Sequence, residues 1–280
     1  MELDQAANAA RAAKAAGLKH VIWSTLEDTR PHFTILGSEP PTIGDGYKVP
    51  HPDAKNEANA YFTALGVPTT FLKTSFFYEM FIHAGLSPRR GPDGAATLTL
   101  PMGDSVMALV AAEDIGRTAY GIFQAGARFI NRTIGLAGTH ATGRQLAALF
   151  TKVLGEPVAY RPMTHDQLRA AGFPDAEELG NMFQFFTDAA ATFVGNRDLN
   201  LIRTLNPASS LSKTGYSSTA PNCNPPSEPE PTRGTVDRRQ KRAYGAVSTT
   251  TPSRTTSPTV ARSVDHQMSP SFRSSSTTGL

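Results

Sequence analysis

The first 72 residues alternate between helical patterns and short apolar strands. Of all features of the sequence, this alternation excludes the most alternative folds. Residues 1–16 are alanine-rich, hold no proline or glycine, and precede Gly17, as is typical of a helix and its C-terminal glycine. Two apolar runs, 20–24 and 68–72, enclose a second helical segment that begins near Pro52 and ends before Gly66. Continuous apolar strands joined by helices predict an α/β fold with a parallel sheet.

Weaker patterns continue beyond residue 72. Two short apolar runs on either side of Gly103-Asp104 predict a hairpin of residues 97–100 and 106–110. Periodicity and capping residues predict further helices over 113–124, 143–154 after Thr142, 165–171 after Thr164, and 176–194. Two segments rich in glycine or proline, 29–49 and 135–143, are interpreted as loops.

The composition changes abruptly near Asn206-Pro207. Residues 208–280 contain 15 Ser, 12 Thr and 8 Pro, and hold nine basic and four acidic residues. Such a segment buries too little apolar surface to offset its ordering entropy, so we predict a disordered tail over 208–280 and a folded domain over 1–207. The tail therefore carries a net charge of +5 and the body a net charge of −2, which together give the +3 of the whole chain.

Several functional classes are disfavoured by what the sequence lacks. The single cysteine, Cys223, excludes a disulfide within the chain and any cysteine-cluster metal site, and no histidine–carboxylate pair has helical metal spacing. No apolar run approaches a membrane span, and the first residues lack the pattern of a signal peptide, so we expect an intracellular protein without a membrane partner. The basic run 238–242 can be interpreted as a nuclear-localisation or nucleic-acid patch, or as a chance cluster in a polar segment. We favour the chance cluster and expect no direct nucleic-acid binding.

Two groups of side chains are candidates for a binding site. His51 and Lys55 stand four residues apart at a helix start, so they share one face and can address one ligand. On spacing alone, an exposed polar pair without a function is the favoured alternative. Residues 74–79 follow the second strand, and ligands of open α/β sheets bind beyond the carboxyl ends of strands. The alternative for Phe76 and Phe77 is a purely structural place in the core.

Taken in order over residues 1–207, many short motifs resemble the NmrA-like family, which belongs to the atypical short-chain dehydrogenases/reductases. Residues 17–27 look like its central strand, and His51-Pro52-Asp53-Ala54-Lys55 is similar to its His-Phe-Asp-x-Lys helix. The further motifs are 66–70, 101–104, 113–116, 172–174, 179–183 and 205–207.

The resemblance implies a partial Rossmann-like domain that binds NADP(H), with NAD as the alternative, and a smaller α/β lobe. It implies that Lys55 contacts the nicotinamide ribose and, with His51 in the place of the usual tyrosine, forms the catalytic pair if the protein is an enzyme. Other cofactor contacts implied or predicted are Ser24, Thr25, Phe77, Tyr78, Glu79 and Met80. Family members often have asparagine at the position of Met80.

The resemblance also implies a role. Many family members are cofactor-binding regulators or redox sensors, and fungal relatives restrain a GATA-type transcription factor in nitrogen metabolite repression. We therefore expect a sensor in the cytoplasm, or alternatively the nucleus, with a GATA-type factor as partner. The alternatives are an NAD(P)H-dependent oxidoreductase that uses Lys55 and His51, and a fragment that is an interaction protein or has no function of its own.

The front of the family pattern does not occur in this sequence. The family begins with a strand, a Gly-x-x-Gly-x-x-Gly loop and further βα units, all before the helix that opens this chain. That loop anchors the pyrophosphate through backbone N–H groups. From this we expect a truncated domain with impaired cofactor binding and an open strand edge.

Overall fold

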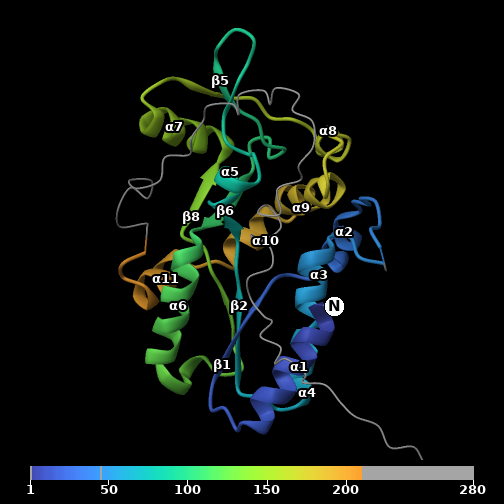
Figure 1. Ribbon diagram of the computed structural model, residues 1–280, viewed down its shortest axis with the longest axis vertical. Coiled ribbons are helices and arrows are strands. Elements are labelled where there is room, and N and C mark those ends of the chain that lie inside the picture. The colour runs from blue at the N-terminus through green and yellow to red at the C-terminus, as the bar shows by residue number, and fades with distance from the viewer. Residues whose placement is uncertain (1, 45, 210–280) are drawn as a thin grey trace, which may run out of the picture. The chain divides into compact units, whose positions relative to one another are not determined.

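The computed structural model describes residues 2–44 and 46–209, and Figure 1 shows their helices and strands. A parallel sheet with the order β1-β2-β7 is built from β1 (Val21–Thr25), β2 (Thr69–Lys73) and β7 (Thr133–Gly135). Both pairings are parallel, which confirms the α/β fold predicted from the first 72 residues. Within the described ranges β1 pairs with β2 alone, so one edge of this sheet carries no neighbouring strand.

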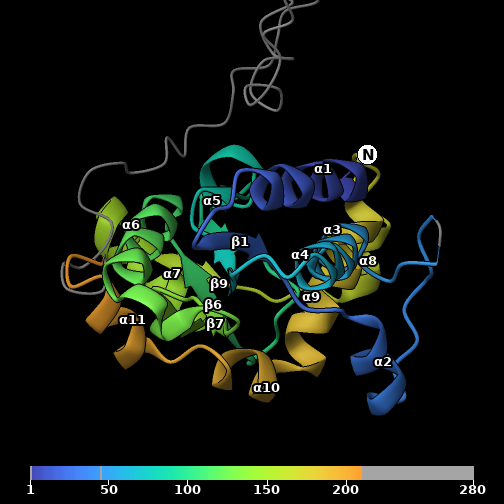
Figure 2. The same cartoon turned by 90° about the horizontal axis from the view of Figure 1, so that it is seen from below.

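Helices pack on both faces of this sheet: α1 (Glu2–Ala15), α4 (Asn59–Ala64), α6 (Ala112–Gln124) and α11 (Leu199–Leu205). Successive side chains of a strand point to opposite faces. Val21 and Trp23 accordingly contact the core formed with α1 and α4, whereas Ile22 contacts the core formed with α6 and α11. Figure 2 shows the two pairs of helices on opposite sides of β1.

The smaller part of the fold has its own sheets and its own core. Its strands are β3 (Phe76–Phe77), β4 (Arg89–Arg90), β5 (Ala96–Leu98), β6 (Val106–Val110), β8 (Thr139–Thr142) and β9 (Val158–Tyr160). They form one sheet with the order β3-β6-β8 and another with the order β4-β5-β9. Buried aromatic side chains dominate the core, notably Phe76, Phe81, Phe150, Phe183 and Phe186.

The remaining helices connect or cover these sheets. They are α2 (Arg30–Leu36), α3 (Pro50–Glu57), α5 (Met80–His83), the 3₁₀ turn Gly126–Phe129, α7 (Gly143–Leu154), α8 (His165–Arg169), α9 (Ala176–Asp188) and α10 (Ala190–Gly195). The predicted caps of α7 and α8 are confirmed, because Thr142 and Thr164 each form a capping box with the glutamine three residues later. Gly17, at φ +62°, ends α1 as predicted.

Four expectations from the sequence are wrong in detail. The segments 97–100 and 106–110 do not form a hairpin, because β5 pairs with β4 and β9 while β6 pairs with β3 and β8. The expected loop 135–143 contains β8, whose partner β6 supplies the hydrogen bonds. The expected loop 29–49 contains α2. The single helix expected over 176–194 is divided into α9 and α10 at Ala189.

Other predictions fall outside the described residues. These are the disorder of 208–280 beyond Ser209, Cys223 and the basic run 238–242. In the part of the chain that the structure describes, no helix is long and apolar enough to cross a membrane. The same residues hold no group of three or more histidine, cysteine or acidic side chains suited to a metal ion.

Candidate functional site

The candidate site lies where β1 and β2 end. Thr25 is the last residue of β1 and is fully buried, whereas Ser24 before it is exposed. The backbone N–H of Thr74 donates to the carbonyl of Thr25 at 3.3 Å, so both strand ends stop at the same level. This is the edge of an open α/β sheet at which ligands bind.

Lys55 is attached to this edge through its backbone. The hydroxyl of Thr25 donates to the carbonyl of Lys55 at 2.9 Å, and the amide of Asn56 donates to the carbonyl of Leu26 at 3.1 Å. The ammonium of Lys55 forms an ion pair with Glu2 at the start of α1, at 2.6 Å. About a third of each charged side chain is exposed, 32% for Lys55 and 38% for Glu2, so a ligand can reach the pair. Two predicted site residues, Thr25 and Lys55, are therefore in direct contact.

His51, one turn before Lys55 on α3, has a different acidic partner. Its backbone N–H donates to Oε1 of Glu178 at 3.0 Å, and its Nδ1 lies 2.5 Å from the same oxygen. Burial opposes ionisation of Glu178, yet the hydrogen bonds from the ring and backbone of His51 hold the pKa of this carboxyl below its usual value. His51 and Lys55 thus share a helix face but bind different carboxylates.

Asp53 holds the first turn of α3 in place. The carboxylate is fully buried and accepts hydrogen bonds from both the backbone N–H and the hydroxyl of Thr29, at 2.7 and 2.8 Å. It also accepts from the backbone N–H groups of Lys48 and Val49, at 2.9 and 3.0 Å. A buried charge is stable only when such donors surround it. The sequence predicted only that Asp53 lies in a helix. It did not predict that four hydrogen-bond donors surround the carboxylate.

A buried arginine lies beside the same strand ends. Arg197 pairs with Glu27, 170 residues before it in the sequence, and also donates to the carbonyls of Thr74 at 2.5 Å and Phe193 at 2.8 Å. Its guanidinium lies 3.6 Å from the ring centroid of Phe193. Burial lowers the pKa of Arg197, and Glu27 opposes that shift. The sequence offered no signal for this residue, because a lone arginine between two helices has no local pattern.

The residues predicted to lie beside the nicotinamide pack against two different cores. Phe77 packs on the core of the parallel sheet, while Tyr78 and Met80 pack on the aromatic core of the smaller part. Burial raises the pKa of Tyr78 to about 12, so its phenol stays protonated at neutral pH. Glu79 accepts a hydrogen bond from the backbone N–H of Ala112 at 3.0 Å and so caps α6.

Several buried polar atoms among the described residues stand without a hydrogen-bond partner. Two of them, near these strands, are the hydroxyl of Ser75, which directly follows Thr74, and Nε2 of His140 on β8. Ser75 is 6% exposed. Burial and the charge of Arg197 lower the pKa of His140, so its ring is neutral near pH 7. Buried polar groups without partners are costly, and they are common where a ligand or water completes the site.

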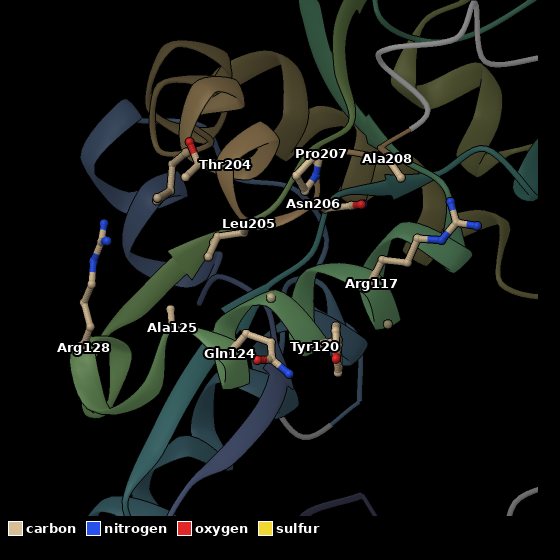
Figure 3. A pocket seen from close by; sticks show the side chains of 13 residues that line it. Arg117, Tyr120, Gln124, Ala125, Arg128, Thr204, Leu205, Asn206, Pro207 and Ala208 are labelled. Carbon is tan, nitrogen blue, oxygen red and sulfur yellow. The ribbon is translucent and has the colours of Figure 1, made fainter.

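A separate groove of about 730 Å³ lies between α6 and α11. Figure 3 shows Arg117 and Arg128 at its opposite ends and Tyr120 between them. Its base is formed where Leu205 crosses α6, and the amide of Asn206 donates to buried Asp114 at 2.9 Å. None of the predicted site residues lines this groove.

Comparisons with known proteins agree with the fold. A sequence profile of the NmrA-like family matches residues 1–197. The structure of NmrA, a negative transcriptional regulator, in complex with NAD matches with a TM-score of 0.59 and 20% identity, over 77% of this chain and 69% of that one. The Citrobacter sp. triphenylmethane reductase complexed with NADP(H) matches with a TM-score of 0.56 and 18% identity, over 78% and 71%. At these identities the structural likeness establishes the fold alone.

Proposed function

Since this chain belongs to the NmrA-like family, we propose that it binds NADP(H), or alternatively NAD, and acts as a redox sensor of the transcriptional-regulator type. In such a protein the cofactor's redox state changes what the protein contacts, and turnover is not required. We further propose a GATA-type transcription factor as the partner, met in the cytoplasm or the nucleus.

The observation that carries the proposal is the place of Lys55. The hydroxyl of Thr25, at the end of β1, donates to the backbone carbonyl of Lys55, and among the described residues the ammonium of Lys55 pairs with the partly exposed Glu2. An ammonium is a donor only, and it suits the hydroxyl pair of a ribose. The hydroxyl of Ser75, which has no partner among the described residues, and the exposed hydroxyl of Ser24 add polar groups after β2 and near the end of β1. These residues fit the nicotinamide–ribose half of the cofactor.

The described residues contain fewer groups that could bind the phosphates of the cofactor. They contain no Gly-x-x-Gly-x-x-Gly loop, which in the resemblance supplies the pyrophosphate contacts. When bound, the cofactor would supply a hydride or report the redox state through its nicotinamide ring. Lys55, Thr25 and Ser24 would orient the ribose, and Phe77 and Tyr78 would limit access of water to the ring.

A titration followed by amide NMR tests the cofactor proposal. We expect millimolar NADPH to shift the resonances of Ser24, Thr25 and Ser75, and Lys55→Ala to abolish these shifts. Lys152→Ala, which removes an exposed lysine of α7, is the matched control and should leave them unchanged. A second form, with a Gly-x-x-Gly-x-x-Gly βα unit joined ahead of Met1, should bind more tightly. Absence of binding to either dinucleotide in both forms would refute the cofactor proposal.

A second candidate function, an NAD(P)H-dependent oxidoreductase, is favoured by one observation. His51 and Lys55 lie one turn apart on α3, and the ring of His51 contacts the carboxylate of Glu178. Proton donation by a positioned side chain is the step that carbonyl reduction requires besides hydride transfer. NADPH consumption with carbonyl or quinone substrates, lost in Lys55→Ala, would support this function. Lack of turnover across a broad panel would count against it.

The partner proposal needs its own experiment. The chain would be used to capture a GATA-type zinc-finger protein, with NADP⁺, with NADPH and without cofactor. A sensor should bind differently in the oxidised and reduced states, because a ligand shifts an equilibrium only through different affinities for its states. Equal capture in all three conditions would argue against the sensor role.

A further inference from the structure

Glu178 and His51 form a two-point contact between the first turns of α9 and α3. One carboxylate oxygen accepts both the backbone N–H of His51 at 3.0 Å and the ring Nδ1 at 2.5 Å. The two residues are 127 positions apart, so only the tertiary fold brings them together. The contact is partly shielded, since the side chains of His51 and Glu178 are 43% and 23% exposed.

The contact decides which ring nitrogen carries the proton. The pKa of Glu178 is below its usual value despite burial, so this group is a carboxylate at neutral pH and can only accept hydrogen bonds. Nδ1 of His51 must then be the donor. Within residues 2–44 and 46–209, no hydrogen bond reaches Nε2 of His51. In the neutral ring Nε2 therefore keeps its lone pair, and in the charged ring it is the nitrogen with an available proton.

The rest of α3 keeps this arrangement rigid. Val49, the residue before the helix, provides no side-chain cap, and Glu178 supplies the missing acceptor from a distant element. On the other side, buried Asp53 binds Lys48 and Val49 through their backbone N–H groups. The first turn is thus held from two directions, which is how a functional side chain is kept in one orientation.

We propose that Glu178 is a positioning residue for His51, and that it presents Nε2 as the proton-exchanging atom beside Lys55. The proposal rests on the oxidoreductase function and deepens it. In that reaction a bound, reduced nicotinamide cofactor would supply the hydride that the carbonyl carbon of a substrate gains as its C=O π bond becomes a C–O single bond, and the cofactor would be left oxidised. The Nε2–H proton passes to the carbonyl oxygen, which yields an alcohol. The ring is left neutral, with its Nδ1–H still donated to Glu178.

The tautomer of His51 can be measured without any cofactor. Long-range ¹H–¹⁵N spectra of the purified chain, at a pH where the ring is neutral, should show a protonated Nδ1 and an unprotonated Nε2 for His51. Glu178→Ala should give a mixture of tautomers. Glu177→Gln is the matched control, because Glu177 is the exposed neighbour in the same turn of α9, and it should keep the native pattern. A native chain with an Nε2–H neutral ring, or an unchanged pattern in Glu178→Ala, would overturn the proposal.

Kinetics supply the second measurement. If carbonyl reduction is found, Glu178→Ala should lower kcat by about tenfold or more with little change in KM, since general acids contribute roughly 100-fold or more. Amide spectra of each variant report whether it is folded, and if Glu178→Ala is not, Glu178→Gln takes its place in both measurements. The tautomer measurement tests the contact between His51 and Glu178, whereas the NADPH titration tests the cofactor proposal. Failure of one proposal can therefore be told apart from failure of the other. An altered KM with unchanged kcat would also contradict a positioning role.

Discussion

The guanidinium of Arg197 and the carboxylate of Glu27 form a two-pronged salt bridge inside the protein, with Nη1–Oε1 and Nη2–Oε2 distances of 3.1 Å each. Glu27 follows β1, and Arg197 lies between α10 and α11. The same guanidinium donates to the carbonyl of Thr74 after β2. One side chain therefore joins the end of the described chain to both strand ends at the candidate site.

Removing this arginine should destabilise the fold strongly. Arg197→Met leaves Glu27 buried without its partner, and breaking a buried pair costs about 3–5 kcal/mol. Urea unfolding should show the loss, while Arg203→Met, on the exposed side of α11, should stay close to the native value. The double variant Glu27→Leu/Arg197→Met removes both charges, so it should recover part of the loss. A single variant as stable as the native chain would contradict this account of the pair.

Gly121 is the second position where the structure predicts a large effect. A Cβ atom there would lie 1.9 Å from the carbonyl oxygen of Leu205, which is backbone and cannot rotate away. Gly121→Ala should therefore separate α6 from α11 and cost about 1–3 kcal/mol or more. Thermal unfolding followed by circular dichroism measures the cost.

Gly116 is the matched control for Gly121, because it lies on the same helix and a Cβ atom would meet nothing within 4 Å. Gly116→Ala should stabilise the chain by about 0.5–1 kcal/mol, since alanine restricts the unfolded chain and favours the helix. Opposite signs for the two variants would confirm that the close approach of Leu205 matters. Equal effects would show that helix propensity alone explains both.

The sequence predicted well those features that depend on neighbours along the chain. The parallel sheet followed from helices between continuous apolar strands, and the helix caps at Thr142 and Thr164 followed from residues next to the helix starts. The predicted hairpin failed because β5 pairs with β9, about 60 residues later, and no local pattern reports such a partner. The pattern around Gly103-Asp104 shows only that the chain turns there.

The candidate site was predictable only in part. Thr25 was expected at the end of a strand and Lys55 at the start of a helix, and both positions follow from local patterns; the hydrogen bond that joins them is a finding of the structure. The acidic partners Glu2 and Glu178 were not foreseen, since carboxylates that pair across 53 and 127 residues have no shared motif. Asn181 belongs to the motif 179–183. Its side chain is fully buried, and its amide donates hydrogen bonds to the carbonyls of Pro41 and Lys48.

The carboxyl of Glu178 should titrate at a lower pH than an ordinary glutamate. His51→Phe removes the ring hydrogen bond that lowers the pKa, whereas the burial that raises it remains, so the pKa of Glu178 should move upward. Carboxyl ¹³C NMR during an acid titration measures this. His83→Phe changes an exposed histidine of α5 that has no hydrogen bond to Glu178, so it is the control and should leave Glu178 unaffected.

The sign of the stability effect follows from this shift. A carboxyl whose pKa is lower in the folded state stabilises the protein above its unfolded pKa, and this stabilisation is lost as the pH falls through the folded pKa. The native chain should therefore lose this contribution on acidification from about pH 4.5 downward. If the pKa of Glu178 does not rise in His51→Phe, the contact seen in the structure does not set the ionisation of this group.

The ion pair of Glu2 with Lys55 should compete with cofactor binding. The ammonium cannot hold a ribose hydroxyl and the carboxylate in the same positions, so Glu2→Gln should raise the affinity for NADPH. Both side chains are about one-third exposed, and exposed pairs are worth no more than about 1 kcal/mol, so the gain should be at most about fivefold. Glu156→Gln removes an equal charge of similar exposure, one that pairs with Arg90 in the smaller part of the fold, and serves as the control. Weaker binding in Glu2→Gln would mean that the carboxylate orients Lys55 for the ligand and does not compete with it.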